Sequence, residues 1–142
     1  MHFKTHLLSR NLIALSVATL LATSAMAMGQ PEYKAAKDQI AADYKVNQQK
    51  CDALSGNAKD VCVKDAKAAH VTAKENAKVA KAAAKPGETA TEKAAGVAEA
   101  RKDAAAEKNE ANYKAAKERC DALAGDLKSK CVDDAKRQFG QS

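Results

Sequence analysis

The chain has no tryptophan, and aromatic residues make up only 4% of its 142 residues. Large aliphatic side chains are also scarce from Met28 onward, where alanine is the dominant apolar residue. Alanine favours helices but buries little surface, so the composition predicts helices without a thick hydrophobic core. A chain with so little core has little scaffold on which to hold reacting groups in place, which argues against an enzyme.

Histidine is rare, and sequence motifs of catalysis are absent. Of the three histidines, only His70 comes after Met28. The chain has no glycine-rich phosphate loop, no G-x-S-x-G and no H-E-x-x-H motif. We therefore expect no catalytic residue, no cofactor and no bound metal, and we interpret His70 as a partly exposed surface residue.

The N-terminal segment, 1–27, has the features of a secretory signal peptide. Two basic residues precede the apolar run LIALSVATLL, and an A-x-A cleavage site, AMA, follows it. This pattern predicts cleavage between Ala27 and Met28. Because the apolar run is too short to span a membrane as a stable helix, we expect no stable membrane insertion after cleavage. The predicted location is periplasmic or secreted.

Basic residues are numerous but are not clustered. The net charge is +6, and it falls to +4 when the N-terminal segment is set aside. Lysines alternate with acidic residues and alanines, so the pattern predicts a solvated helix surface and no nucleic acid as partner. Glu110 and Lys114, like Asp133 and Arg137, have the i,i+4 spacing of helical ion pairs.

The most specific feature of the sequence is a repeated segment. CDALSGNAKDVC, residues 51–62, returns 69 positions later as CDALAGDLKSKC, residues 120–131. A tyrosine precedes each copy by seven residues, and a D-A-K triplet follows each copy. The central glycines, Gly56 and Gly125, are expected to end one helix in the left-handed conformation. The next residues, Asn57 and Asp126, are the expected N-caps of the following helix.

Four cysteines permit three pairings. The cysteines of the first copy lie five residues before and six residues after Gly56, at equal heights on antiparallel arms, where a disulfide can form. We predict the pairs Cys51–Cys62 and Cys120–Cys131. A crossed pair, such as Cys51–Cys131, would need the two hairpins to dock side by side. Free buried thiols and a metal site are the alternatives, but zinc ligands usually have the closer spacing C-x2–4-C.

Two further signals divide the chain. Pro86-Gly87 should break a helix, and Thr89 with Glu92 forms a capping-box sequence for the next one. The predicted fold is all-α, with two disulfide-stapled hairpins joined by long Ala/Lys-rich helices in an elongated or loosely packed arrangement. Its expected parts are hairpin 28–85, break 86–89 and hairpin 90–142. The predicted helices are about 31–54, 58–85, 89–124 and 127–139. The expected inner seam of the second helix is Cys62, Ala66, Ala69, Ala73, Ala77, Ala80 and Ala84.

The segments EYKAAKDQI, CDALSGNAKDVCVKDAKAA and YKAAKERCDAL resemble Ala/Lys-rich exported proteins of Gram-negative bacteria. These proteins carry a duplicated Cys-x10-Cys hairpin, are uncharacterised, and are sometimes described as TolA-like cell-envelope proteins. The segment TATEKAAGVAEARKDAAAEK is also similar to the 11-residue repeats of late-embryogenesis-abundant proteins. The first resemblance implies an envelope protein, and the second implies a hydrophilic stress protectant.

Three functional hypotheses are consistent with these features. The first is a non-enzymatic periplasmic structural or interaction protein, with a link to cell-envelope stress and an unknown envelope protein or surface as its partner. The second is a hydrophilic stress protectant or chaperone-like protein, because the apolar content is low for autonomous folding. The third is a thiol-redox or metal-handling protein.

Overall fold

A computed structural model describes residues 28–141 of the chain, and these residues are all-α, as predicted. They form α1 (Gln30–Cys51), α2 (Gly56–Ala83), α3 (Ala90–Cys120) and α4 (Gly125–Phe139). The predicted helix ends differ from these bounds by a few residues. The predicted signal peptide, with Ala27 on one side of its cleavage site, lies outside the described residues, so its cleavage stays a prediction.

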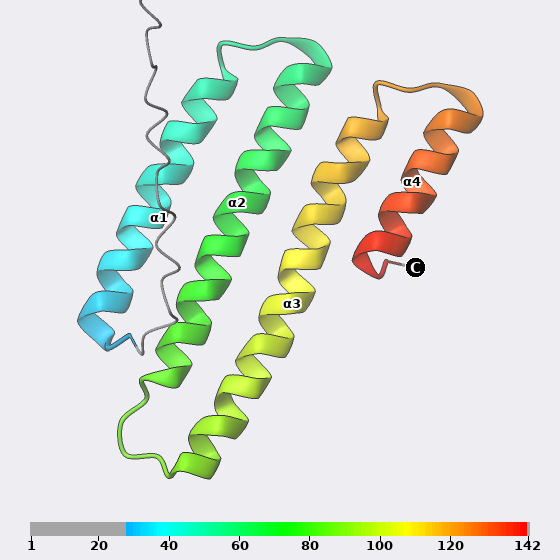
Figure 1. The fold of residues 1–142 in the computed structure, drawn as a ribbon. Helices are drawn as coiled ribbons and strands as arrows, with labels where there is room; N and C mark the ends of the chain where they lie inside the picture. The colour runs from blue at the N-terminus through cyan, green and yellow to red at the C-terminus, as the bar shows by residue number, and fades with distance from the viewer. Residues whose placement is uncertain (1–27, 142) are drawn as a thin grey trace, which may run out of the picture.

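The four helices lie side by side in a single layer (Figure 1). Among the described residues, α1 contacts α2, α2 contacts α3, and α3 contacts α4, and no other pair of helices is in contact. Each helix runs antiparallel to the next, so the chain consists of two hairpins, α1–α2 and α3–α4, that pack through α2 and α3 (Figure 1). Within residues 28–141, no further helix covers either broad face of the layer.

Glycine sets both hairpin turns, although the helix starts differ from the prediction. Gly56 and Gly125 have φ values of 55° and 56°, in the left-handed region that glycine adopts without strain. The following helices begin at these glycines, and their N-caps are Ser55 and Ala124. The prediction of Asn57 and Asp126 as N-caps was therefore wrong, because the left-handed glycine already starts the helical turn in which they lie.

The break between the hairpins follows the sequence signals. The chain leaves α2 after Ala83 and enters α3 through a capping box. The hydroxyl of Thr89 accepts a hydrogen bond from the backbone N–H of Glu92, and the Glu92 carboxylate accepts one from the backbone N–H of Thr89 at 2.9 Å. This box satisfies backbone donors that would otherwise lack a partner at the helix start.

The core is thin, and alanines make up most of it. The buried apolar residues are Cys51, Ala66, Ala68, Val71, Ala77, Ala80, Ala104, Ala115, Cys120 and Ala135. The seam predicted for α2 was only partly right, since Ala66, Ala77 and Ala80 are buried whereas Ala69 is exposed. The reason is that α2 packs against a helix on each side and therefore buries two faces instead of one.

Candidate functional site

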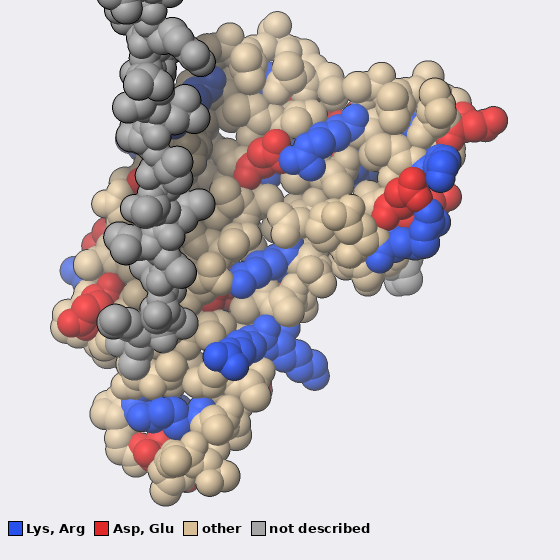
Figure 2. All heavy atoms as spheres, in the orientation of Figure 1, with Lys and Arg blue, Asp and Glu red and all other residues tan. Residues whose placement is uncertain are grey.

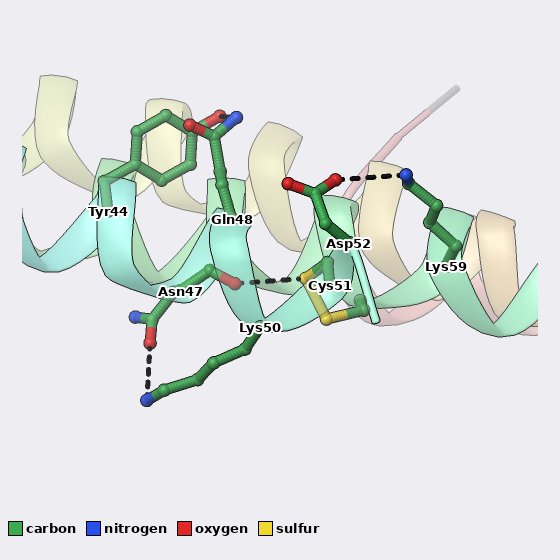
Figure 3. Close-up of a disulfide and its surroundings, with 8 residues drawn as sticks. Tyr44, Asn47, Gln48, Lys50, Cys51, Asp52 and Lys59 are labelled. Carbon is green, nitrogen blue, oxygen red and sulfur yellow. Dashed lines mark hydrogen bonds and ion pairs between the residues drawn. A yellow bond between two sulfur atoms is a disulfide. The ribbon is translucent and has the colours of Figure 1, made fainter. Parts of the chain in front are cut away.

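The first hairpin is held closed by a disulfide and an ion pair. Cys51 and Cys62 form the predicted disulfide, with their Cα atoms 5.5 Å apart. The Sγ of Cys51 lies 3.2 Å from the carbonyl oxygen of Asn47, one turn earlier in α1 (Figure 3). Beyond the disulfide, the ammonium of Lys59 lies 3.0 Å from a carboxylate oxygen of Asp52 across the turn (Figure 3). The turn therefore carries one covalent and one ionic link.

The second hairpin repeats both links. Cys120 and Cys131 form the other predicted disulfide, with a Cα–Cα distance of 5.7 Å. Lys128 pairs with Asp121 at 2.7 Å, and these two residues are the counterparts of Lys59 and Asp52 in the duplicated segment. The hydrogen bond from Lys128 lowers the pKa of Asp121. Sequence reasoning missed these ion pairs, although an acid and a lysine seven residues apart occur in both copies.

An aromatic contact lies deeper in the first hairpin. The ring of Tyr44 in α1 lies 4.5 Å, centroid to centroid, from the ring of His70 in α2. The Nδ1 atom of His70 is buried and has no hydrogen-bond partner among residues 28–141. His70 is partly exposed, as predicted, but it packs between helices and does not stand free on the surface. The equivalent positions of the second repeat hold Tyr113 and Phe139.

Ionic contacts join the two hairpins along α2 and α3. Arg119 of α3 pairs with Asp65 of α2, and Lys64 lies 3.8 Å from Glu118. Further along, the ammonium of Lys108 donates to the side-chain oxygen of Asn76 at 2.5 Å. These contacts bring together residues that lie far apart in the sequence.

The most buried charged residue of the described chain is Glu75, at 1% exposure. Helical periodicity places it on the side of α2 that faces α3, together with Ala68 and Val71. Its carboxylate is 2.8 Å from the ammonium of Lys78 and 3.7 Å from that of Lys74. The hydrogen bond with Glu75 is the main cause of the raised pKa of Lys78. We assign the pair a structural role, since Lys78 and Lys74 provide positive charge beside the buried carboxylate of Glu75.

An open groove of ≈ 500 Å³ lies along the junction of the two hairpins. Alanines and short polar side chains form much of it. Its lining consists of Asp65, Ala68, Ala69, Thr72, Ala73, Asn76, Asn112, Ala115, Arg119 and Phe139. A surface of this kind suits contact with another macromolecule better than enclosure of a small substrate, because ligand pockets bury most of the ligand.

Charge is dispersed over the broad face that Figure 2 shows. Lysines and arginines stand singly or beside acidic residues, with uncharged surface between them. The part of this face that the grey atoms leave visible in Figure 2 has no continuous basic strip of the kind that nucleic-acid-binding proteins present. Within residues 28–141, no helix is long and apolar enough to cross a membrane. The same residues contain no cluster of three or more histidines, cysteines or carboxylates in a metal-binding arrangement.

All four cysteines are oxidised, which indicates an oxidising compartment. Comparisons of the chain with protein-family models, with curated proteins and with solved structures found no match. The resemblance to exported Ala/Lys-rich proteins thus stays a prediction. The candidate functional site is accordingly defined by geometry alone, as the open helical layer and its edges.

Proposed function

We propose that the protein is a non-enzymatic helical interaction module that acts in an oxidising, exported environment, with a periplasmic role at the cell envelope. The observation that carries this proposal is the single layer of helices held by two local disulfides. The described residues form an open groove instead of an enclosed substrate pocket, and the layer displays a large surface for its length. Contact with a macromolecule uses that surface directly, whereas catalysis would need groups converging in a sheltered site.

The disulfides support this function because they keep the layer ordered where its core is weak. Each closes a loop with a sequence separation of 11, which corresponds to roughly 3 kcal/mol in the chain-entropy model. A preorganised surface loses less conformational entropy on binding than a flexible one. A role during envelope stress belongs to this proposal, since a module stapled covalently retains its shape when conditions weaken hydrophobic packing.

Site-specific photo-crosslinking in intact cells tests this proposal. A photoreactive residue replaces Ala69 or Ala73 in the groove, and the control is the same residue in a variant with all four cysteines changed to serine. We expect discrete adducts with one or a few proteins, lost in the control because the ordered layer is lost. A full set of positions over both broad faces that gives no adduct would contradict the proposal.

Circular dichroism separates this function from that of a hydrophilic protectant. An interaction module should show a cooperative thermal transition in dilute buffer, because its helices pack against one another in the absence of any partner. A protectant of the late-embryogenesis-abundant type would instead be a coil in solution and gain helix on drying. Observation of the latter behaviour would favour the protectant.

A further inference from the structure

The duplication relates the outer helix α1 to the inner helix α3. Residues 69 positions apart are counterparts, as the two disulfides show. One stripe of α3 packs on α2, with Ala104 and Ala115 each 2% exposed. Within the same stripe, Lys108 contacts Asn76 and Glu118 contacts Lys64. The whole stripe consists of Ala104, Lys108, Ala111, Ala115 and Glu118.

The counterpart stripe on α1 is uncovered. It consists of Ala35, Gln39, Ala42, Val46 and Gln49, and all five residues are exposed. The opposite side of α1 faces α2, since Tyr44 stacks on His70 there and Cys51 is bonded to Cys62. Val46 is 49% exposed, whereas its counterpart Ala115 is 2% exposed. The stripe that α3 buries against α2 therefore has an exposed counterpart on α1, at the edge of the layer (Figure 1).

The α1 stripe differs from the α3 stripe in a way that suits contact with the same stripe of a second copy. Lys108 and Glu118 of α3 meet polar partners on α2, but their counterparts on α1 are the neutral residues Gln39 and Gln49. The α1 stripe therefore has no charge, in a chain in which 30% of the residues are charged. In a symmetric dimer the same patch lies on both sides, so a stripe without charge avoids burying an unpaired charged group at the interface.

The other edge of the layer, formed by α4, is covered with charged side chains. The exposed side of α4 carries Lys130, Asp134 and Arg137, and Asp134 forms ion pairs with both basic residues. A polar outer face is typical of the terminal unit in a repeat array, where it prevents further stacking. Of the two edges of the described layer, the α1 edge is the one with a stripe that holds no charged residue, which makes α1 the edge suited to association.

We infer that the exposed stripe of α1 binds the same stripe of a second copy, antiparallel and centred near Ala42, to form a symmetric dimer. The inference rests on the proposed interaction function and names its first partner, another copy of this chain. Each copy would then extend the helical layer of the other, with a charged α4 at each outer edge. The antiparallel direction matches that of the α2–α3 contact within the chain (Figure 1).

Two charged residues beside the α1 stripe favour the antiparallel arrangement over the parallel one. Asp38 and Lys45 are seven residues apart and therefore lie on the same side of α1. Neither has an ion-pair or side-chain hydrogen-bond partner among residues 28–141. The antiparallel arrangement brings Asp38 of one copy level with Lys45 of the other, twice by symmetry, while a parallel arrangement would bring like residues level.

The contact between α3 and α2 within the chain also involves an acidic residue beside the stripe. Glu107 of α3 is the counterpart of Asp38, and it acts on Lys78 of α2. The hydrogen bond with Glu75 and, to a smaller extent, the charge of Glu107 raise the pKa of Lys78. An acid beside the stripe thus attracts a lysine of the adjacent helix, as proposed for Asp38 and Lys45 between copies.

Sedimentation equilibrium of the purified, oxidised protein tests the inference. We expect a reversible monomer–dimer equilibrium with a dissociation constant of about micromolar order, as for a small interface. Val46→Glu should weaken association at least about 100-fold, because it buries an unpaired charge on each side of the two-fold axis. Leu54→Glu is the matched control, since Leu54 is 44% exposed at the hairpin tip, and it should leave the equilibrium unchanged.

A charge exchange tests the direction of packing without affecting the fold. Asp38→Lys alone and Lys45→Asp alone should each weaken the dimer about tenfold, and the double variant should restore it. A protein that stays monomeric at millimolar concentration would overturn the inference, as would a dimer that tolerates Val46→Glu. If either result is found but photo-crosslinked adducts with other proteins form in cells, the dimer is refuted and the proposed interaction function is retained. The two proposals can therefore fail separately.

Discussion

The carboxylate of Glu75, only 1% exposed, lies 2.8 Å from the ammonium of Lys78, one turn further along α2. Glu75 is the largest fully buried side chain of residues 28–141, so the centre of the layer holds an ion pair where a larger domain would hold a hydrophobic residue. The Glu75 carboxylate lies inside the protein, whereas the Lys78 side chain is 48% exposed and borders solvent.

The first prediction concerns this ion pair. Lys78→Met should destabilise the fold by about 1–2 kcal/mol, because it leaves a buried carboxylate with only the more distant Lys74. Lys102→Met, at an exposed site, is the control and should change stability by less than about 0.5 kcal/mol. Glu75→Leu should be neutral or stabilising, because it replaces the buried charge with an apolar side chain. Urea unfolding measures all three, and equal losses in Lys78→Met and Lys102→Met would contradict the structural role.

The second prediction concerns His70. Its Nδ1 atom is buried without a partner among the described residues, and the second repeat has Phe139 at the equivalent position. His70→Phe should therefore stabilise the protein by about 1 kcal/mol, since it removes an unsatisfied polar atom and keeps the ring contact with Tyr44. His70→Ala should lose that contact and destabilise. A lower melting temperature in His70→Phe would show that the imidazole has a polar partner in solution.

The third prediction separates the two disulfides. Replacing Cys120 and Cys131 together with serine should destabilise the protein by roughly 3 kcal/mol and release α4 first. The reason is that α4 is short, contacts only α3 among the described helices, and has Ala135 as its one buried residue. Hydrogen exchange should therefore rise in α4, while α1 and α2 keep their protection. Peptide mapping should still find Cys51 bonded to Cys62, and a loss of protection in α1 and α2 as large as that in α4 would contradict the independence of the hairpins.

The fourth prediction is a pH dependence at the start of α3. Hydrogen bonds from the hydroxyl and then the backbone N–H of Thr89 lower the pKa of Glu92. A carboxyl group with a lowered pKa stabilises the fold above its unfolded pKa, and this contribution is lost as the pH falls through the folded pKa. Thr89→Ala should raise the pKa of Glu92 toward its ordinary value and reduce the acid sensitivity of the first turn of α3. Carboxyl titration by NMR measures this shift, and an unchanged Glu92 pKa in Thr89→Ala would refute the capping interaction.

Features set by neighbouring residues were predictable from the sequence. The spacing of Cys51 and Cys62 around Gly56 indicated their disulfide, because a tight helical hairpin places residues equidistant from its turn side by side. The capping box of Thr89 and Glu92 was recognisable for the same reason, since both partners lie within one turn. Some local predictions were nevertheless wrong. Arg137 pairs with Asp134 rather than with Asp133, the i,i+4 residue. The N-caps of α2 and α4 are Ser55 and Ala124 rather than Asn57 and Asp126.

The sequence by itself determined the secondary structure, the hairpins and the disulfide pairs, because these depend on residues that lie close together along the chain. Only the tertiary structure decided that the hairpins pack through α2 and α3, that Arg119 meets Asp65 across 54 positions, and that Glu75 is buried. Alanines occur on several sides of α1, α2 and α3, so periodicity gives no unique inner face. The physical reason is that an alanine-rich helix offers several surfaces of similar packing energy, and the choice among them depends on which neighbours the complete fold provides.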